Sequence, residues 1–218
     1  MDQKPHIVVF ASGSKDGGGS GFEKLVKNSR TKALSAQIVA VVSNHETGGV
    51  CTRARQLGVP FIHFPGPWTA ERYQQIFALV RADFTALSGW LKLVSGLDPR
   101  TTINIHPGPL PRFGGYGMHG HHVHEAVMKA YRAGEITHSA VCMHFVTSEY
   151  DRGPVFFRRH VRIDPDDTPE SLAARVNAEE HAWQSVITNL VVTGRISWNG
   201  SAPKSLKVPC GYSIITSD

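Results

Sequence analysis

The chain has few cysteines and no long apolar segment. Its three cysteines, Cys51, Cys142 and Cys210, lie far apart and without CxxC spacing, which argues against a disulfide framework and against a cysteine-based zinc site. Nowhere do roughly 18 or more apolar residues run without interruption, as a transmembrane helix would require, and the start of the chain has no signal-peptide pattern. We therefore expect a cytoplasmic protein without a membrane partner.

Internal repeats, low-complexity segments and linkers are also missing. The chain has 218 residues, of which 41% are hydrophobic, and this is enough to bury one sizeable core. We expect a single domain over residues 1–218.

The positive charge is not concentrated in one stretch. The formal net charge is +5 and the pI is near 9.2, but the basic residues occur as separate pairs, such as Arg53 with Arg55 and Arg158 with Arg159. Nucleic-acid binding would favour a basic stripe. Because the basic residues form no stripe, we expect no nucleic-acid partner. Mild positive charge also suits a small anionic substrate.

Strand-like and helix-like segments alternate along the first half of the chain. The apolar run 6–11 predicts a buried strand, and the glycine-rich stretch SGSKDGGGSG leads from it into a predicted helix over 22–32. The pattern then repeats, with strands expected at 36–43, 59–64 and from Phe84, and helices expected at 48–58 and 69–82. Such alternation predicts an α/β fold that is Rossmann-like and doubly wound, with a mostly parallel sheet and helices on both faces.

The second half contains two further predicted helices around a pair of strands. One helix is expected over 120–134 and two strands joined by a loop within 138–163. In the last helix Thr168 is the expected N-cap, Pro169 suits the first helical position and Gly194 ends the helix. The tail from Ser201 is expected to be loop-like and peripheral.

The glycine-rich stretch is a candidate phosphate site. Backbone N–H groups and the positive end of the following helix favour an anion there, and Gly19, Ser20 and Gly21 are the best candidates. The stretch matches neither a P-loop nor GxGxxG. A flexible surface loop remains the alternative.

Four histidines, His119, His121, His122 and His124, gather before and within the helix expected near Gly120. On a helix His121 and His124 share one face and His122 points away, so the four cannot converge on one ion. We expect no metal here, and a segment that lines a polar cleft instead.

Asn104 and His106 end a short apolar strand. In an extended chain their side chains face the same way, and an amide beside an imidazole can hold a developing oxyanion and move a proton. Asp151, before a Gly-Pro turn, could raise the pKa of a nearby imidazole. The alternatives are that Asn104 caps a turn, that His106 bonds internally and that Asp151 forms an Asx-turn.

Taken together, NIHPGPLP, then GMHGHH, then HFVTSEYDRGP resembles the ordered motif set of the folate-dependent formyltransferases, and the likeness covers about nine tenths of the chain. The resemblance implies formyl transfer from 10-formyltetrahydrofolate to the amine of glycinamide ribonucleotide, in purine synthesis, through a tetrahedral intermediate and without a metal. It implies that Asn104 donates to the formyl oxygen and that His106, as imidazolium, stabilises the oxyanion. Asp151 would keep His106 charged and order a water.

The same resemblance implies substrate contacts along the chain. For the ribonucleotide, Gly19, Ser20 and Gly21 would hold the phosphate, Asn177 would lie near it and Glu180 would contact the ribose. The expected folate-binding residues are Trp90, Leu91, Lys92, Leu93, Val94, Val146, Thr147, Glu149 and Tyr150. Residues 1–102 would then form the phosphate-binding half, 103–200 the catalytic and folate-binding half, and 201–218 the tail.

Two departures and several alternatives stay open. The glycine-rich stretch is longer than the short turn typical of the family, so Lys15 either adds a charge at the phosphate or lies in solvent, and Lys92 stands where arginine is common. A formyltetrahydrofolate hydrolase and methionyl-tRNA formyltransferase typically carry an extra domain for which this chain has no room, and sugar-nucleotide formyltransferases share the trio. A non-catalytic nucleotide- or metal-binding module would leave the trio unexplained. We expect a monomer or a homodimer.

Overall fold

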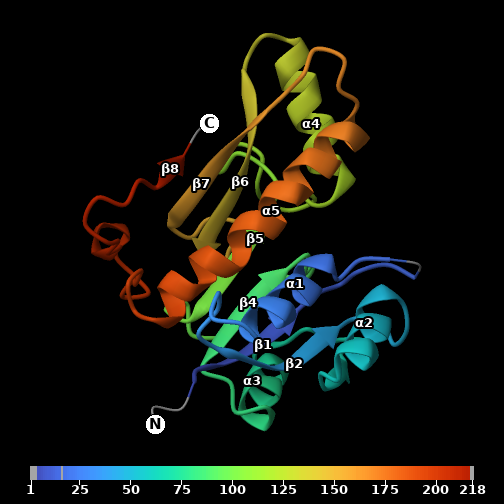
Figure 1. The fold of residues 1–218 in the computed structure, drawn as a ribbon, viewed down its shortest axis with the longest axis vertical. Coiled ribbons are helices and arrows are strands. Elements are labelled where there is room, and N and C mark those ends of the chain that lie inside the picture. The colour runs from blue at the N-terminus through green and yellow to red at the C-terminus, as the bar shows by residue number, and fades with distance from the viewer. Residues whose placement is uncertain (1–3, 16, 217–218) are drawn as a thin grey trace.

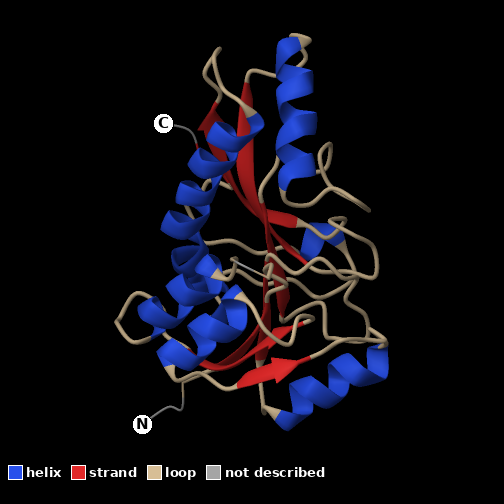
Figure 2. Ribbon diagram, turned by 90° about the vertical axis from the view of Figure 1, so that its right-hand side faces the viewer, coloured by secondary structure: helices blue, strands red, loops and turns tan. Residues whose placement is uncertain are grey.

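The computed structural model describes residues 4–15 and 17–216, which form one eight-stranded sheet flanked by helices (Figures 1 and 2). The strands are β1 His6–Phe10, β2 Gln37–Ser43, β3 Phe61–His63, β4 Phe84–Ser88, β5 Thr102–His106, β6 His138–Phe145, β7 Val155–Arg162 and β8 Ile215–Thr216. The helices are α1 Ser20–Ser29, α2 Gly49–Leu57, α3 Ala70–Leu79, α4 His121–Arg132 and α5 Pro169–Val192.

The strand order, β3-β2-β1-β4-β5-β6-β7-β8, places a change of direction between β1 and β4. Strands β1 to β5 are parallel, whereas β6 pairs antiparallel with β5 and with β7. Connections leave β1 and β4 toward opposite sides, and this opens a crevice at their carboxyl ends. The predicted doubly wound, mostly parallel sheet is confirmed.

The helices cover both faces of the sheet. Buried side chains of α1, α2 and α5, such as Phe22, Val50 and Leu172, belong to one large apolar cluster, and α1 lies against α5 (Figure 1). Helix α3 contributes Tyr73 to a second cluster, together with Phe10 of β1. Because successive residues of β1 point to opposite faces, its uninterrupted apolar run supplies both clusters.

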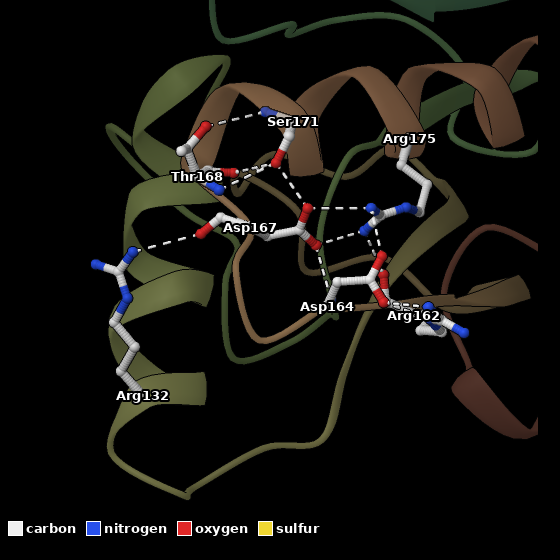
Figure 3. Close-up of polar contacts among 7 residues, drawn as sticks. All are labelled: Arg132, Arg162, Asp164, Asp167, Thr168, Ser171 and Arg175. Carbon is white, nitrogen blue, oxygen red and sulfur yellow. Dashed lines mark hydrogen bonds and ion pairs between the residues drawn. The ribbon is translucent and has the colours of Figure 1, made fainter.

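Helix α5 begins and ends as its sequence predicts. Thr168 accepts from the Ser171 N–H, the Ser171 side chain accepts from the Thr168 N–H, Pro169 is the first residue and Gly194 has a φ of 71°. Before the helix lies Asp167, which is buried and accepts from Ser171 and Arg175 (Figure 3).

This group ties α5 to its neighbours. Arg175 also pairs with Asp164 after β7, and Arg132 at the end of α4 donates to the carbonyl of Asp167 (Figure 3). The start of α5 is thereby fixed to both β7 and α4. From there α5 runs on to pack against α1.

The tail corrects one prediction. Most of it is irregular, as expected, but Pro203–Ser205 forms a short 3-10 helix and β8 pairs parallel with β7. Tyr212 donates to the carbonyl of Phe156 and packs on the main cluster. A strand of two residues is too short to produce a periodic pattern in the sequence, and β8 forms only because it pairs with β7.

Among the helices that the structure describes, none is both long enough and apolar enough to cross a membrane.

Candidate active site

A cavity of about 1100 Å³ opens at the crevice between the carboxyl ends of β1, β4 and β5. Its wall is built from the glycine-rich loop and the start of α1, the segment after β4, the end of β5, the segment 115–121 and one side of α5. Segments that are far apart in the sequence therefore meet in one hollow large enough for two small molecules.

The start of α1 forms one end of the cavity, and Gly19, Ser20 and Gly21, the candidate phosphate-binding residues, line it. Gly19 precedes the helix with a φ of 79°, and no side-chain hydrogen bond from the described residues caps the helix. The first-turn N–H groups are therefore free for an anion. A Cβ on Gly21 would lie 2.3 Å from Ser88 Oγ, so glycine lets the helix approach β4 closely.

The long glycine loop is supported from α2. A Cβ on Gly49 would lie 2.2 Å from the Gly17 carbonyl oxygen, and one on Gly48 would lie 2.4 Å from that of Ser14. Lys15 is exposed and does not line the cavity, while Arg53 donates to the Gly18 carbonyl. The pair Gly48–Gly49 was not identified from the sequence, where its only signal is two glycines at a helix start.

His181 is a further side chain at this end that the sequence did not identify. Its Nε2 lies 3.0 Å from Ser20 Oγ. Burial lowers the pKa of His181, and nearby Lys24 lowers it further. No spacing rule links residue 181 to residue 20, because the contact depends on how α5 packs on α1.

Glu180 and Asn177, the candidate ribose- and phosphate-side residues, lie on the same side of α5 and line the cavity. Asn177 Nδ2 donates to Glu180 Oε2 over 3.2 Å. Burial raises the pKa of Glu180 to about 7, and the bond from Asn177 offsets this only in part. A carboxylate held this way is a ready acceptor for hydroxyl donors of a ligand.

Asn104 and His106 both line the cavity from β5, as alternation along the strand predicts. The ring of His106 is buried, its Nε2–H donates to the Phe113 carbonyl over 2.7 Å, and its Nδ1 lies 3.8 Å from Asp151 Oδ2. The internal bond of His106 and the cavity-facing role therefore coexist, since each uses a different nitrogen.

The charge state of His106 depends on its burial and on its neighbours. Burial lowers the pKa of His106, and Asp151 and the Phe113 carbonyl oppose this without cancelling it. The imidazole of the free protein is thus neutral at neutral pH, with its proton on Nε2 and a lone pair on Nδ1. Desolvation thus opposes the expected imidazolium, whereas the carboxylate at 3.8 Å favours it.

Asp151 is fixed by its own backbone and by the segment after Phe113. Its φ is 54°, which is unusual for a residue with a side chain, and its Oδ2 accepts from the Gly115 N–H over 2.9 Å. Burial raises the pKa of Asp151, but the nearby imidazoles of His144 and His106 and the Gly115 N–H outweigh it, and the net shift is downward. The carboxylate is therefore ionised.

His144 completes the group and was missed by sequence reasoning. It pairs with Asn104 across β5 and β6. Its Nδ1 lies 2.8 Å from the Phe145 carbonyl oxygen, and its Nε2 lies 3.0 Å from Asn104 Nδ2 and 3.3 Å from Asp151 Oδ1. Asn104 Nδ2 also reaches Asp151 Oδ1 over a long 3.4 Å contact. The Asn104 amide is thus positioned by His144 and, over the longer contact, by Asp151.

The predicted folate-binding residues divide into two groups. Trp90, Leu91, Lys92, Leu93 and Tyr150 line the cavity. Val94 is buried in the second apolar cluster, Val146 packs on that cluster, and Thr147 and Glu149 bond to each other in the loop after β6, outside the cavity wall. Trp68, which was not predicted, lines the cavity and lies under Lys92 Nζ at 4.5 Å.

The histidines near α4 behave as their spacing predicts. His119, His121 and His124 line the cavity, while His122 is exposed and contacts Glu125. Over residues 4–15 and 17–216, no group of three or more histidine, cysteine, aspartate or glutamate side chains is arranged to hold a metal ion.

Comparison with known proteins identifies related chains. The sequence profile of the family described as formyl transferase matches residues 5–188. A chloroplastic phosphoribosylglycinamide formyltransferase of Arabidopsis thaliana is 33% identical over 90% of this chain and 68% of its own length. The phosphoribosylglycinamide formyltransferase of Bacillus subtilis is 30% identical over 85% of this chain and 94% of its own. The chain spans about two thirds of the length of the plant relatives.

Solved structures give the same result for the fold. The crystal structure of glycinamide ribonucleotide transformylase 1 from Symbiobacterium toebii superposes with a TM-score of 0.79 at 25% identity, over 94% of each chain.

Proposed function

The chain belongs to the formyl transferase family, and from that premise we propose that it transfers the formyl group of 10-formyltetrahydrofolate to the amine of glycinamide ribonucleotide, a step of purine synthesis. The observation that carries the proposal is the contact of Asn104, His106 and Asp151 at the wall of one cavity. Relatives named for this activity support the choice of acceptor.

We place the acceptor along α1 and α5. Its phosphate accepts from the first-turn N–H groups of α1 and from Ser20 beside His181, and its ribose hydroxyls donate to Glu180. This orientation points the amine toward His106. In this proposal the phosphate-binding half is residues 1–102, although α5 of the catalytic half supplies Asn177 and Glu180.

We place the pteridine of the donor against the segment Trp90–Leu93 and Tyr150. This part of the wall offers apolar side chains, among them the partly exposed Leu91 and Leu93, which suit a flat heterocycle. Because Val94, Val146, Thr147 and Glu149 lie outside the wall, they would act through the backbone or the packing of this segment.

In the reaction the lone pair of the amine attacks the formyl carbon, and the electrons of the carbon–oxygen double bond move to the oxygen. An N–H of Asn104 donates to this oxygen as negative charge develops. The Nδ1 lone pair of His106 takes the proton from the attacking nitrogen. The imidazolium then has an N–H directed at the Asp151 carboxylate, which stabilises it.

Collapse of the intermediate completes the transfer. The bond from the formyl carbon to the donor nitrogen breaks, and His106 returns its proton to that leaving nitrogen. His106 is neutral before and after the reaction, which agrees with its burial in the free protein. We further propose that the protein is cytoplasmic and acts as a monomer or homodimer.

Replacement of the reacting side chains tests this function. Asp151→Asn and His106→Ala should each lower kcat by about 10² to 10⁴, since they stabilise mainly the transition state, and should leave the Kd for glycinamide ribonucleotide nearly unchanged. His122→Ala, at an exposed position outside the cavity, is the control. Turnover near that of the wild type in the correctly folded Asp151→Asn protein would contradict the proposal.

A further inference from the structure

His124 is a cavity residue to which the reaction as described assigns no task. It lies in the second turn of α4, its side chain is only 5% exposed, and it lines the same cavity as Asn104 and His106. Its Nδ1 is sealed from solvent and finds no hydrogen-bond partner among the described residues. A buried polar atom without a partner costs stability, so a purely structural role explains His124 poorly.

The ring of His124 stays neutral. Burial, with smaller contributions from the neighbouring His121 and His106, lowers the pKa of His124 to about 4. A neutral imidazole has one N–H donor and one lone pair. Since Nδ1 is sealed within the protein while the residue lines the cavity, the Nε2 edge is the one that a ligand meets. The proton belongs on Nε2, because a sealed lone pair is easier to leave unpaired than a sealed N–H.

The position of His124 relates it to the acceptor. The start of α4 faces the start of α5, where His121 Nε2 lies 3.6 Å from Glu170 Oε1. Farther along α5 the cavity wall continues through Asn177 to Glu180. His124 therefore lines the same cavity as Glu180 and lies close enough to His106 for that imidazole to act on its pKa.

We propose that His124 Nε2–H donates a hydrogen bond to the carboxamide oxygen of the acceptor, and so distinguishes acceptors with an amide next to the ribose. The inference rests on the proposed function, which places the ribose at Glu180 and the amine at His106. The part of glycinamide ribonucleotide between these two points is the carboxamide. A neutral N–H donor matches this uncharged carboxamide. A charged side chain in the same place would lose its hydration without meeting an opposite charge.

Binding of two ligands tests the contact. Glycinamide ribonucleotide and ribose 5-phosphate share the phosphate and the sugar, but only the first has the amide. In titration calorimetry, His124→Phe should weaken glycinamide ribonucleotide binding about tenfold, the loss of one hydrogen bond, and leave ribose 5-phosphate binding unchanged. His124→Gln, whose amide N–H can replace Nε2–H, should recover most of the affinity, and His122→Ala is the matched control on the same helix.

Thermal unfolding supplies a second readout. His124→Phe removes the unpaired Nδ1 and should not lower the melting temperature, so weaker binding cannot be ascribed to misfolding. Equal losses for both ligands, or unchanged affinity for glycinamide ribonucleotide in His124→Phe, would overturn the contact. If the wild type transfers formyl groups to glycinamide ribonucleotide and His124→Phe binds it normally, only this inference fails. If the wild type does not use that acceptor, the proposed function fails and the inference fails with it.

Discussion

At the scale of single residues, burial shifts the pKa of two titratable groups that line the cavity. Burial disfavours charge on both His106 and Glu180, which lowers the pKa of the imidazole and raises that of the carboxyl group. His106 therefore begins neutral and able to take a proton. Glu180, by contrast, changes charge within the physiological range.

The titration of Glu180 predicts a pH dependence of acceptor binding. With a pKa of about 7, the carboxyl group loses its charge as the pH falls, and its strength as an acceptor for ribose hydroxyls falls with it. KM for glycinamide ribonucleotide should rise about tenfold from pH 8 to pH 6. Glu180→Gln should raise KM at pH 8 and flatten the profile, and a profile equal to that of the wild type would remove Glu180 from the site.

The raised pKa of Glu180 also makes the stability of the fold depend on pH. The folded protein holds the Glu180 proton more tightly than the unfolded chain, so the ionised group destabilises the fold as the pH rises from the unfolded value near 4.5 through the folded value near 7. Glu180→Gln should therefore raise the melting temperature at pH 8 and change it less at pH 4.5. A melting temperature lowered at pH 8 would show that the carboxylate is stabilising.

At the scale of elements, the glycine loop depends on the close approach of α2. Alanine at a helix position normally stabilises by roughly 1 kcal/mol over glycine, but a Cβ on Gly49 would lie 2.2 Å from the Gly17 carbonyl oxygen. Gly49→Ala should displace the loop and raise KM for the ribonucleotide about fivefold or more, while kcat changes little. Gly17→Ala is the control, because its new Cβ would meet only Ser14 Oγ at 3.5 Å. This variant should have the KM of the wild type. An unchanged KM in Gly49→Ala would refute the steric argument.

The start of α5 depends on Asp167. Hydrogen bonds from Arg175 hold the pKa of Asp167 well below its usual range, although burial opposes them. A lowered pKa stabilises the fold above the unfolded value near 3.9, and this contribution is lost as the pH falls below it. Asp167→Asn should cost roughly 2 to 3 kcal/mol at pH 7, because it leaves Arg175 without its buried partner, and the difference from the wild type should shrink toward pH 3.

Urea unfolding at both pH values measures this effect, and Asp166→Asn, at the exposed neighbouring position, provides the control. An equal loss in the two variants at pH 7 would mean that the group around Asp167 adds nothing specific.

Elements were predictable from the sequence where their signals are local. Thr168, Pro169 and Gly194 gave both ends of α5, and alternation gave the shared direction of Asn104 and His106. His144 and His181 were not found, because strand register and helix packing bring them to the site. Val94 was expected in the cavity wall but is buried, since the chain turns into the second apolar cluster after β4.

At the scale of the whole molecule, the order of the strands assembles the site. The crevice between β1 and β4 brings the start of α1 beside the segment after β4, and β5 adds Asn104 and His106 next to it. The antiparallel β6 returns the chain so that the loop after it carries Asp151 to the same place. Fold, family and side-chain geometry thus agree on an acyl-group transfer between two small substrates.

The most direct test of this account is the choice of acceptor by the purified protein. It should be supplied with 10-formyltetrahydrofolate and, in competition, with glycinamide ribonucleotide, a sugar-nucleotide amine and water, and the formylated products should be quantified. The account predicts that formylated glycinamide ribonucleotide dominates and that Asp151→Asn abolishes most of it. Predominant formate release, or transfer mainly to the sugar-nucleotide amine, would contradict it.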